Sequence, residues 1–143
     1  MKKNAVRELL YRLEMERRHK LQPLFAHLGL TPGQPRVLSR LLEHGGGVTQ
    51  RELADSCYLD ATTLSRALDR LEERGLVARS TDGSNRRANL ITLTAEGEGV
   101  AREVAEGFHR MDVGLWEGFT EEEMETLLDG LERLRRNLDR LEN

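Results

Sequence analysis

The stretch that decides the fold is residues 49–93, TQRELADSCYLDATTLSRALDRLEERGLVARSTDGSNRRANLITL. It opens with Thr49-Gln50-Arg51-Glu52, a capping box in which a threonine and a glutamate three residues later satisfy free amides at a helix start. This short helix ends near residues 57–59, and Asp60 can cap a second helix that runs to Gly75. Two short helices joined by a few residues predict a helix–turn–helix.

A β-hairpin is predicted directly after the second helix. Residues 76–79 and 86–93 carry apolar and β-branched side chains, whereas residues 80–85 are all turn formers. The returning strand begins with Arg86 and Arg87 and is therefore basic. A hairpin in this position is the wing of a winged helix–turn–helix.

Two further helices are predicted before this segment. Apolar residues recur with helical spacing over residues 4–28, and Gly29 is a plausible C-terminal cap. Thr31-Pro32-Gly33-Gln34 reads as another capping box, with Thr31 as the cap and Pro32 in the first helical position. The helix that follows ends at the glycines of residues 45–47.

Two more helices follow the hairpin. Thr94 can cap a helix whose apolar residues are spaced by three or four positions, and Thr120 begins a capping box with Glu123. The last helix carries leucines spaced four, three, four and three, which is the a/d seam of a coiled coil: Leu127, Leu131, Leu134, Leu138 and Leu141.

These elements predict a mostly α chain with a small β-hairpin wing. Residues 31–95 would form a winged helix–turn–helix DNA-binding region, and residues 1–30 and 96–143 a helical dimerisation region, the two making one intertwined domain. The apolar stripes of the terminal helices exceed what the small winged region can cover, which indicates an interface between two copies. The alternative is that these helices pack on one another within one chain.

Composition sets the expected setting of the protein. The chain has 143 residues, 38% hydrophobic and 33% charged, so it can bury a core without metals or disulfides. One cysteine, Cys57, excludes an intramolecular disulfide, and no apolar run suggests a membrane span or a signal peptide. We therefore expect a cytoplasmic protein that has no membrane association.

The second helix of the helix–turn–helix offers a polar face. A helical wheel places Leu64, Leu68 and Leu71 on one side. Small hydroxyl residues and arginines, which can reach phosphates and base edges in a major groove, lie opposite or on the flanks. The predicted DNA contacts, including helix-start and hairpin residues, are Gln50, Thr62, Thr63, Ser65, Arg66, Arg70, Arg79, Arg86 and Arg87.

Charge gives only qualified support to DNA binding. The chain has a net charge of -3, and residues 48–95 contain 7 arginines against 7 acidic residues. Binding would depend on where the cations project, since a general basic field is absent. Arg86 and Arg87 beside a Gly/Ser turn suit insertion into a minor groove, with Asp82 or Asn85 as supports.

Five motifs, in this order and spacing, resemble the MarR family of bacterial transcriptional regulators. They are residues 49–54 (TQRELA), 62–66 (TTLSR), 71–79 (LEERGLVAR), 82–87 (DGSNRR) and 93–97 (LTAEG). The resemblance covers residues 31–99 by motif and the flanking helices by order and length. Asn85 departs from it, since the family commonly has an aspartate there that orients a wing arginine, and an ion pair becomes a neutral hydrogen bond.

The resemblance implies a homodimer that reads a roughly palindromic operator in double-stranded DNA, with insertion of Arg86 or Arg87. Two-fold symmetry would place the reading helices about 34 Å apart, in successive major grooves. We expect a repressor released by an effector. The rival hypothesis is a winged-helix protein-interaction module that never contacts DNA, for which the neutral charge is the best support.

The resemblance also implies a small aromatic or anionic effector bound between the dimerisation helices and the winged region. Arg17 interrupts the apolar stripe of the first helix, as an anion site or as a side chain held in an ion pair. Possible lining residues are Tyr11, Arg17, His19, Phe108 and Trp116.

Other chemistry is not indicated by the sequence. Cys57 lies beside the helix–turn–helix turn and reads as a small buried residue in preference to a redox switch. His44 and His109 lack the neighbouring histidine of a closed metal site, and the glycine run lacks the lysine of a phosphate loop. We expect no metal, no cofactor and no enzymatic activity.

Overall fold

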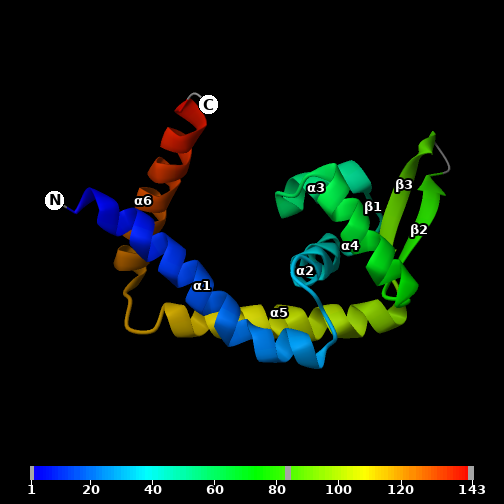
Figure 1. Cartoon of the computed structure of the whole chain (residues 1–143), viewed down its shortest axis with the longest axis horizontal. Helices are drawn as coiled ribbons and strands as arrows, with labels where there is room; N and C mark the ends of the chain where they lie inside the picture. Colours follow the sequence, from blue (N-terminus) through cyan, green and yellow to red (C-terminus); the bar gives the residue numbers. More distant parts are fainter. Residues whose placement is uncertain (1, 83–84, 142–143) are drawn as a thin grey trace. The chain divides into compact units, whose positions relative to one another are not determined.

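The computed structural model describes residues 2–82 and 85–141, with side chains at residues 2–80 and 90–141. Within these residues, the chain forms six helices and a small three-stranded sheet (Figure 1). Their order is α1 (Lys3–His27), α2 (Gln34–His44), β1 (Val48–Thr49), α3 (Gln50–Cys57), α4 (Ala61–Glu73), β2 (Val77–Asp82), β3 (Asn85–Leu93), α5 (Ala95–Leu115) and α6 (Glu121–Arg140). None of these helices is long and apolar enough to cross a membrane. This is the predicted winged helix–turn–helix fold with long terminal helices.

The chain forms two compact units, residues 1–109 and residues 110–143. The first unit holds α1 to α4, the sheet and most of α5. The second holds the end of α5 and α6. This division cuts across the predicted grouping of residues 96–143 with residues 1–30, which stays a prediction.

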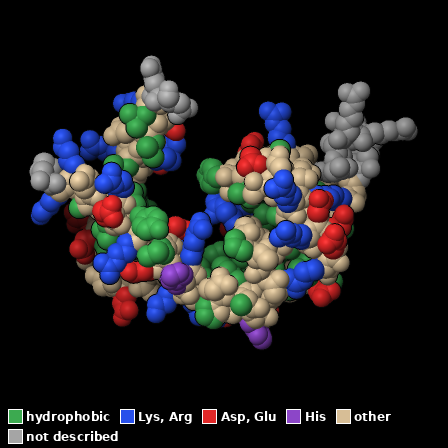
Figure 2. Space-filling view, viewed as in Figure 1, with side chains coloured by type: hydrophobic (Ala, Val, Ile, Leu, Met, Phe, Trp, Pro, Cys, Tyr) green, Lys and Arg blue, Asp and Glu red, His purple; other side chains and the backbone are tan. Residues whose placement is uncertain are grey.

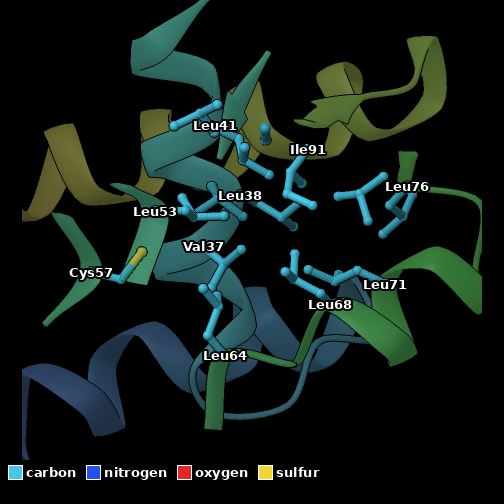
Figure 3. Packing of buried hydrophobic residues seen from close by; sticks show 14 of the residues in the cluster. Val37, Leu38, Leu41, Leu53, Cys57, Leu64, Leu68, Leu71, Leu76 and Ile91 are labelled. Atoms are coloured by element: carbon cyan, nitrogen blue, oxygen red, sulfur yellow. The ribbon is translucent and has the colours of Figure 1, made fainter. Parts of the chain in front are cut away.

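The core of the first unit is built from α2, α3, α4 and the sheet. Leu38, Leu53, Leu64 and Leu68 are fully buried, and Ile91 of β3 covers them (Figure 3). Each of these side chains contributes about 1.5–3 kcal/mol relative to an exposed position. The apolar face of α4 is therefore held inward, as the helical wheel predicted.

The sheet contains one strand more than the predicted hairpin. β3 is central, with β1 and β2 antiparallel on its two sides, and the register pairs Val48 with Ile91 and Val77 with Leu93. β1 was missed because its two residues are too short for a strand pattern, and Thr49 also caps α3. The strands of the hairpin extend to Asp82 and from Asn85, so the predicted turn over residues 80–85 was too long.

The predicted start of α2 was also wrong. A turn closed by the Gln34 amide on the Thr31 carbonyl, at 3.2 Å, precedes the helix, which begins at Gln34. Gly33 has φ of 92°, which a proline–glycine turn accommodates and a first helical residue does not. Half of the expected box survives, since the Gln34 side chain accepts a hydrogen bond from the Thr31 amide at 2.9 Å.

The other helix caps follow the sequence. The hydroxyl of Thr49 accepts the Glu52 amide, and Thr94 accepts the Gly97 amide. Thr120 and Glu123 form the full reciprocal capping box at the start of α6. Side-chain oxygens thus satisfy amides that have no partner within their own helix.

α1 and α5 pack on one another within the first unit. The rings of Phe25 and Phe108 meet edge to face with centroids 5.7 Å apart, and the methyl of Leu24 occupies the space that a side chain at Gly107 would need. Ala101 and Val104 of α5 belong to the buried core. Part of the apolar stripe that was predicted to form a dimer interface is therefore covered within the chain. For these segments the alternative prediction, packing of the terminal helices on one another, is the one observed.

The remaining stripes are exposed. The N-terminal half of α1 and the seam of α6 carry apolar side chains with 39–67% relative exposure: Val6, Leu9, Leu10, Leu13, Leu127, Leu128, Leu131, Leu134, Leu138 and Leu141.

Cys57 is buried at the end of α3, as predicted, with 2% of its surface exposed. Burial raises the pKa of its thiol, and a hydrogen bond with Ser56 opposes this effect only in part. The protonated, enclosed thiol is a poor nucleophile. Cys57 is therefore a small packing residue of the core.

Two glycines near the start of α5 provide a matched test of how closely α5 packs on the backbone before β2. A Cβ on Gly97 would overlap the carbonyl of Leu76, whereas a Cβ on Gly99 would meet nothing within 4 Å. We expect Gly97→Ala to lower the free energy of unfolding by about 1–3 kcal/mol, because backbone must move. Gly99→Ala should raise it by about 0.5–1 kcal/mol through helix propensity. Urea denaturation at fixed protein concentration measures both, and equal effects would contradict the packing described here.

Candidate nucleic-acid interface

The N-terminus of α4 is organised by Asp60. One carboxylate oxygen accepts the Thr63 amide at 2.8 Å, and the other accepts the Thr63 hydroxyl at 2.8 Å. The backbone hydrogen bond from Thr63, followed by the one from its hydroxyl, holds the pKa of Asp60 below its usual value. The hydroxyl proton of Thr63, a predicted DNA contact, is thus used inside the protein.

The outward face of α4 carries most of the other predicted contacts. Thr62, Arg66 and Arg70 are exposed and Ser65 is half-buried, opposite the leucines that enter the core. In the part of the chain that the structure describes, neither arginine has a hydrogen-bond or ion-pair partner. Their guanidinium groups are therefore available to an external anion.

Gln50 and the wing flank this face. Gln50 is the first residue of α3 and is half-buried beside the cap Thr49. In the wing, Asp82 pairs with Asn85 where the hairpin closes, and β3 continues through Arg86 and Arg87. The side chains of these four wing residues lie outside the described residues, so their predicted roles stay predictions.

Arg79 differs in its surroundings from the other predicted contacts. Its Nη1 lies 2.8 Å from the Asp69 carboxylate and 3.7 Å from that of Glu72, and its Nη2 donates to the Ser65 carbonyl at 3.4 Å. Only 20% of the side chain is exposed. The side chain of Arg79 thus extends from β2 to α4 and links the two elements.

Acidic and basic side chains lie close together on one face of the described winged part. Figure 2 shows blue and red side chains side by side on that face. This agrees with the balance of 7 arginines and 7 acidic residues over residues 48–95. Recognition at this surface would rest on individual arginines.

Two arginine contacts were not foreseen. Arg74, at the end of α4, donates to the carbonyls of Gly29 and Leu28 at 2.8 and 3.0 Å, and so joins α4 to the end of α1. Arg36 donates to the Cys57 carbonyl and lies 5.4 Å from the ring centroid of Tyr58, an exposed residue with φ of 55°. Their partners lie 45, 46 and 21 residues away, so no local pattern could signal them.

The residues predicted to line a ligand pocket contact different partners. Tyr11 and His19 are exposed on α1, and Arg17 pairs with Glu14 at 3.4 Å, as the ion-pair alternative predicted. Phe108 packs on Phe25 in the first unit, and Trp116 packs on Phe119 in the second. The contacts described within each unit do not join these side chains into one pocket.

Among the described residues, no group of three or more His, Cys, Asp or Glu side chains is placed to hold a metal ion. The exposed face of α4 presents hydroxyl and guanidinium groups. Such groups donate hydrogen bonds to phosphates and base edges.

Comparison with known proteins points to the same chemistry. The family model described as "MarR family" matches residues 28–88. The uncharacterized HTH-type transcriptional regulator YybA of Bacillus subtilis (strain 168) is 37% identical over 117 residues, which cover 81% of this chain and 77% of that protein.

Solved structures resemble the whole chain. The MepR–DNA complex of S. aureus is 25% identical with a TM-score of 0.84 and covers 91% of this chain and 96% of that one. NadR in complex with 4-hydroxyphenylacetate is 27% identical with a TM-score of 0.75 and covers 90% of this chain and 91% of that one. Sequence identity, shared fold and an exposed reading helix agree, and the chain belongs to the MarR family of winged helix–turn–helix, DNA-binding transcriptional regulators.

Proposed function

We propose that this regulator is a homodimeric repressor, which binds a near-palindromic operator through α4 and the β2–β3 wing and is released by a small aromatic or anionic effector. The observation that carries DNA reading is the exposed face of α4, where Arg66 and Arg70 have no partner among the described residues. The MepR–DNA complex, with a TM-score of 0.84, supports a similar mode of docking. Binding near a promoter would exclude the polymerase.

Dimerisation is supported by the apolar side chains that stay exposed on α1 and α6. Leu131 and Leu134 on the α6 seam are each 39% exposed, and Leu138 is 67% exposed. Leucines in an a/d pattern gain stability when a second helix covers them. A two-fold pair would supply the two reading helices that a palindromic operator requires.

Control by an effector is supported by the NadR complex with 4-hydroxyphenylacetate, an aromatic carboxylate. We propose that Tyr11, Arg17, His19, Phe108 and Trp116 contribute to such a site in the dimer. Arg17 could exchange its exposed pair with Glu14 for the effector carboxylate at little cost, because surface ion pairs are weak.

A gel shift with the DNA upstream of the protein's own gene tests the proposed function. We expect a specific, salt-sensitive shift that Arg86→Ala combined with Arg87→Ala weakens about 100-fold or more, since each wing arginine would contribute roughly 1–3 kcal/mol. Arg66→Ala should relax sequence preference more than it weakens binding to random DNA. The absence of any specific shift by the wild-type protein would refute DNA reading.

The oligomeric state is tested by sedimentation of an α6 variant. Leu131→Glu places a carboxylate on the leucine seam, and we expect it to raise the dimer dissociation constant at least tenfold, in line with a cost of about 2 kcal/mol for an unpaired charge at an interface. Thr126→Glu adds the same charge to an exposed position off the seam and should leave the dimer unchanged. A monomeric wild-type protein at micromolar concentration would contradict the proposal.

Effector binding is tested by thermal unfolding and DNA release in parallel. A ligand at 100 times its Kd stabilises the folded protein by about 2.7 kcal/mol, so 4-hydroxyphenylacetate should raise the melting temperature. The proposed effector binds the DNA-free form more tightly, so the compound should also release the operator. The neutral amide of the same compound is the matched control and should do neither. A panel of phenolic acids that changes neither readout would remove the support for an aromatic carboxylate effector.

A further inference from the structure

We propose that Arg79 is a positioning residue for DNA reading, which offsets part of the negative charge of two carboxylates beside the reading face of α4 and holds that helix against β2. This inference rests on the proposed function, since it assigns a role within DNA binding. It replaces the direct DNA contact that the sequence alone indicated for Arg79.

The first step is the position of the two carboxylates. Asp69 lies one helical turn beyond Ser65 and Arg66, and Glu72 lies one turn further. Their side chains are 58% and 46% exposed. Any phosphate backbone that reaches Arg66 and Arg70 therefore comes near two negative charges, which oppose binding unless they are compensated.

The second step is the compensation itself. Arg79 reaches from β2 to place its Nη1 at 2.8 Å from Asp69 and 3.7 Å from Glu72. The Nη2 donates to the Ser65 carbonyl at 3.4 Å, so the same group also contacts the backbone of the reading helix. One guanidinium thus lowers the repulsion from two carboxylates and donates a hydrogen bond to the helix backbone.

The third step shows that Arg79 cannot contact DNA directly while it is paired with the two carboxylates. With 20% of its side chain exposed and a Nε that is buried without a hydrogen-bond partner, Arg79 has no free edge comparable to those of Arg66 and Arg70. To meet a phosphate it would have to leave both carboxylates. Those carboxylates would then repel the same phosphate.

The fourth step concerns the wing. Arg79 is paired with Ile91 in the β2–β3 register, and Ile91 is buried in the core. Arg86 and Arg87 belong to the same hairpin, at the start of β3. By joining β2 to α4, Arg79 sets the direction in which the wing leaves the reading helix, and a fixed direction lowers the entropy lost when both bind one duplex.

The test is a charge-rescue cycle measured on the operator with the full-length protein. Arg79→Gln keeps the three-carbon stem but removes the charge, and its shorter side chain also gives up the hydrogen bond to the Ser65 carbonyl. We expect it to weaken operator binding about tenfold or more, within the range of couplings in a shared charge network. Adding Asp69→Asn and Glu72→Gln to this variant should restore affinity to within about threefold of the double variant that retains Arg79.

Salt dependence separates positioning from contact. If Arg79 touches no phosphate, the slope of log affinity against log salt keeps its wild-type value in Arg79→Gln. Loss of a direct phosphate contact would instead lower the slope by about 0.9. Arg102→Gln on α5 removes the same charge from an exposed i,i+4 pair with Glu98 and should change neither affinity nor slope.

Thermal unfolding shows whether each variant is folded at the assay temperature. Arg79→Lys provides a second variant that keeps the charge but not the guanidinium fork, and it should bind more tightly than Arg79→Gln and less tightly than wild type. Equal losses with and without the two carboxylates, a slope lowered by about one, or unchanged binding by Arg79→Gln would each overturn the inference. Wild-type protein that binds no operator would instead refute the proposed function, so the two failures are distinguishable.

Discussion

The burial of one face of α4 is the constraint on which the rest of the structure depends. Leu64, Leu68 and Leu71 are completely buried, and α2, α3 and β3 supply the surfaces that cover them. Because a helix repeats every 3.6 residues, Thr62 and Arg66 must lie on the outer face when these leucines point inward. Rotation of α4 about its axis would expose leucines at about 1.5–3 kcal/mol each, so the orientation of the reading face is set by the core.

The ends of α4 are held as firmly as its face. Asp60 accepts the Thr63 amide. At the other end, Arg74 donates to the Leu28 and Gly29 carbonyls, and the Thr94 hydroxyl donates to the Gly75 carbonyl at 2.6 Å. The reading helix is thereby joined to the end of α1 and the start of α5. A change in either long helix has a direct physical route to α4, on which the proposed effector control would depend.

Arginines divide into two groups that composition alone cannot separate. Arg66 and Arg70 extend from the surface without a partner among the described residues, whereas Arg74 and Arg79 are used inside the protein. This division explains how a winged region with equal numbers of arginines and acidic residues can still present cations to DNA. Arg79 pairs with two of the acidic residues beside the reading face, Asp69 and Glu72, and the unpaired arginines set the local potential.

Periodicity and capping chemistry determined the element order, the buried face of α4 and the N-caps at Thr49, Asp60, Thr94 and Thr120, because these depend on residues only three or four positions apart. Tertiary structure alone decided the third strand, the packing of α1 on α5 and the internal use of Arg74 and Arg79. Each of these brings together residues that no helical or strand period connects, 46 positions apart for Arg74 and Leu28 and further apart for Phe25 and Phe108. Local patterns carry no information about such distances, because the free energy of these contacts exists only once the core has formed.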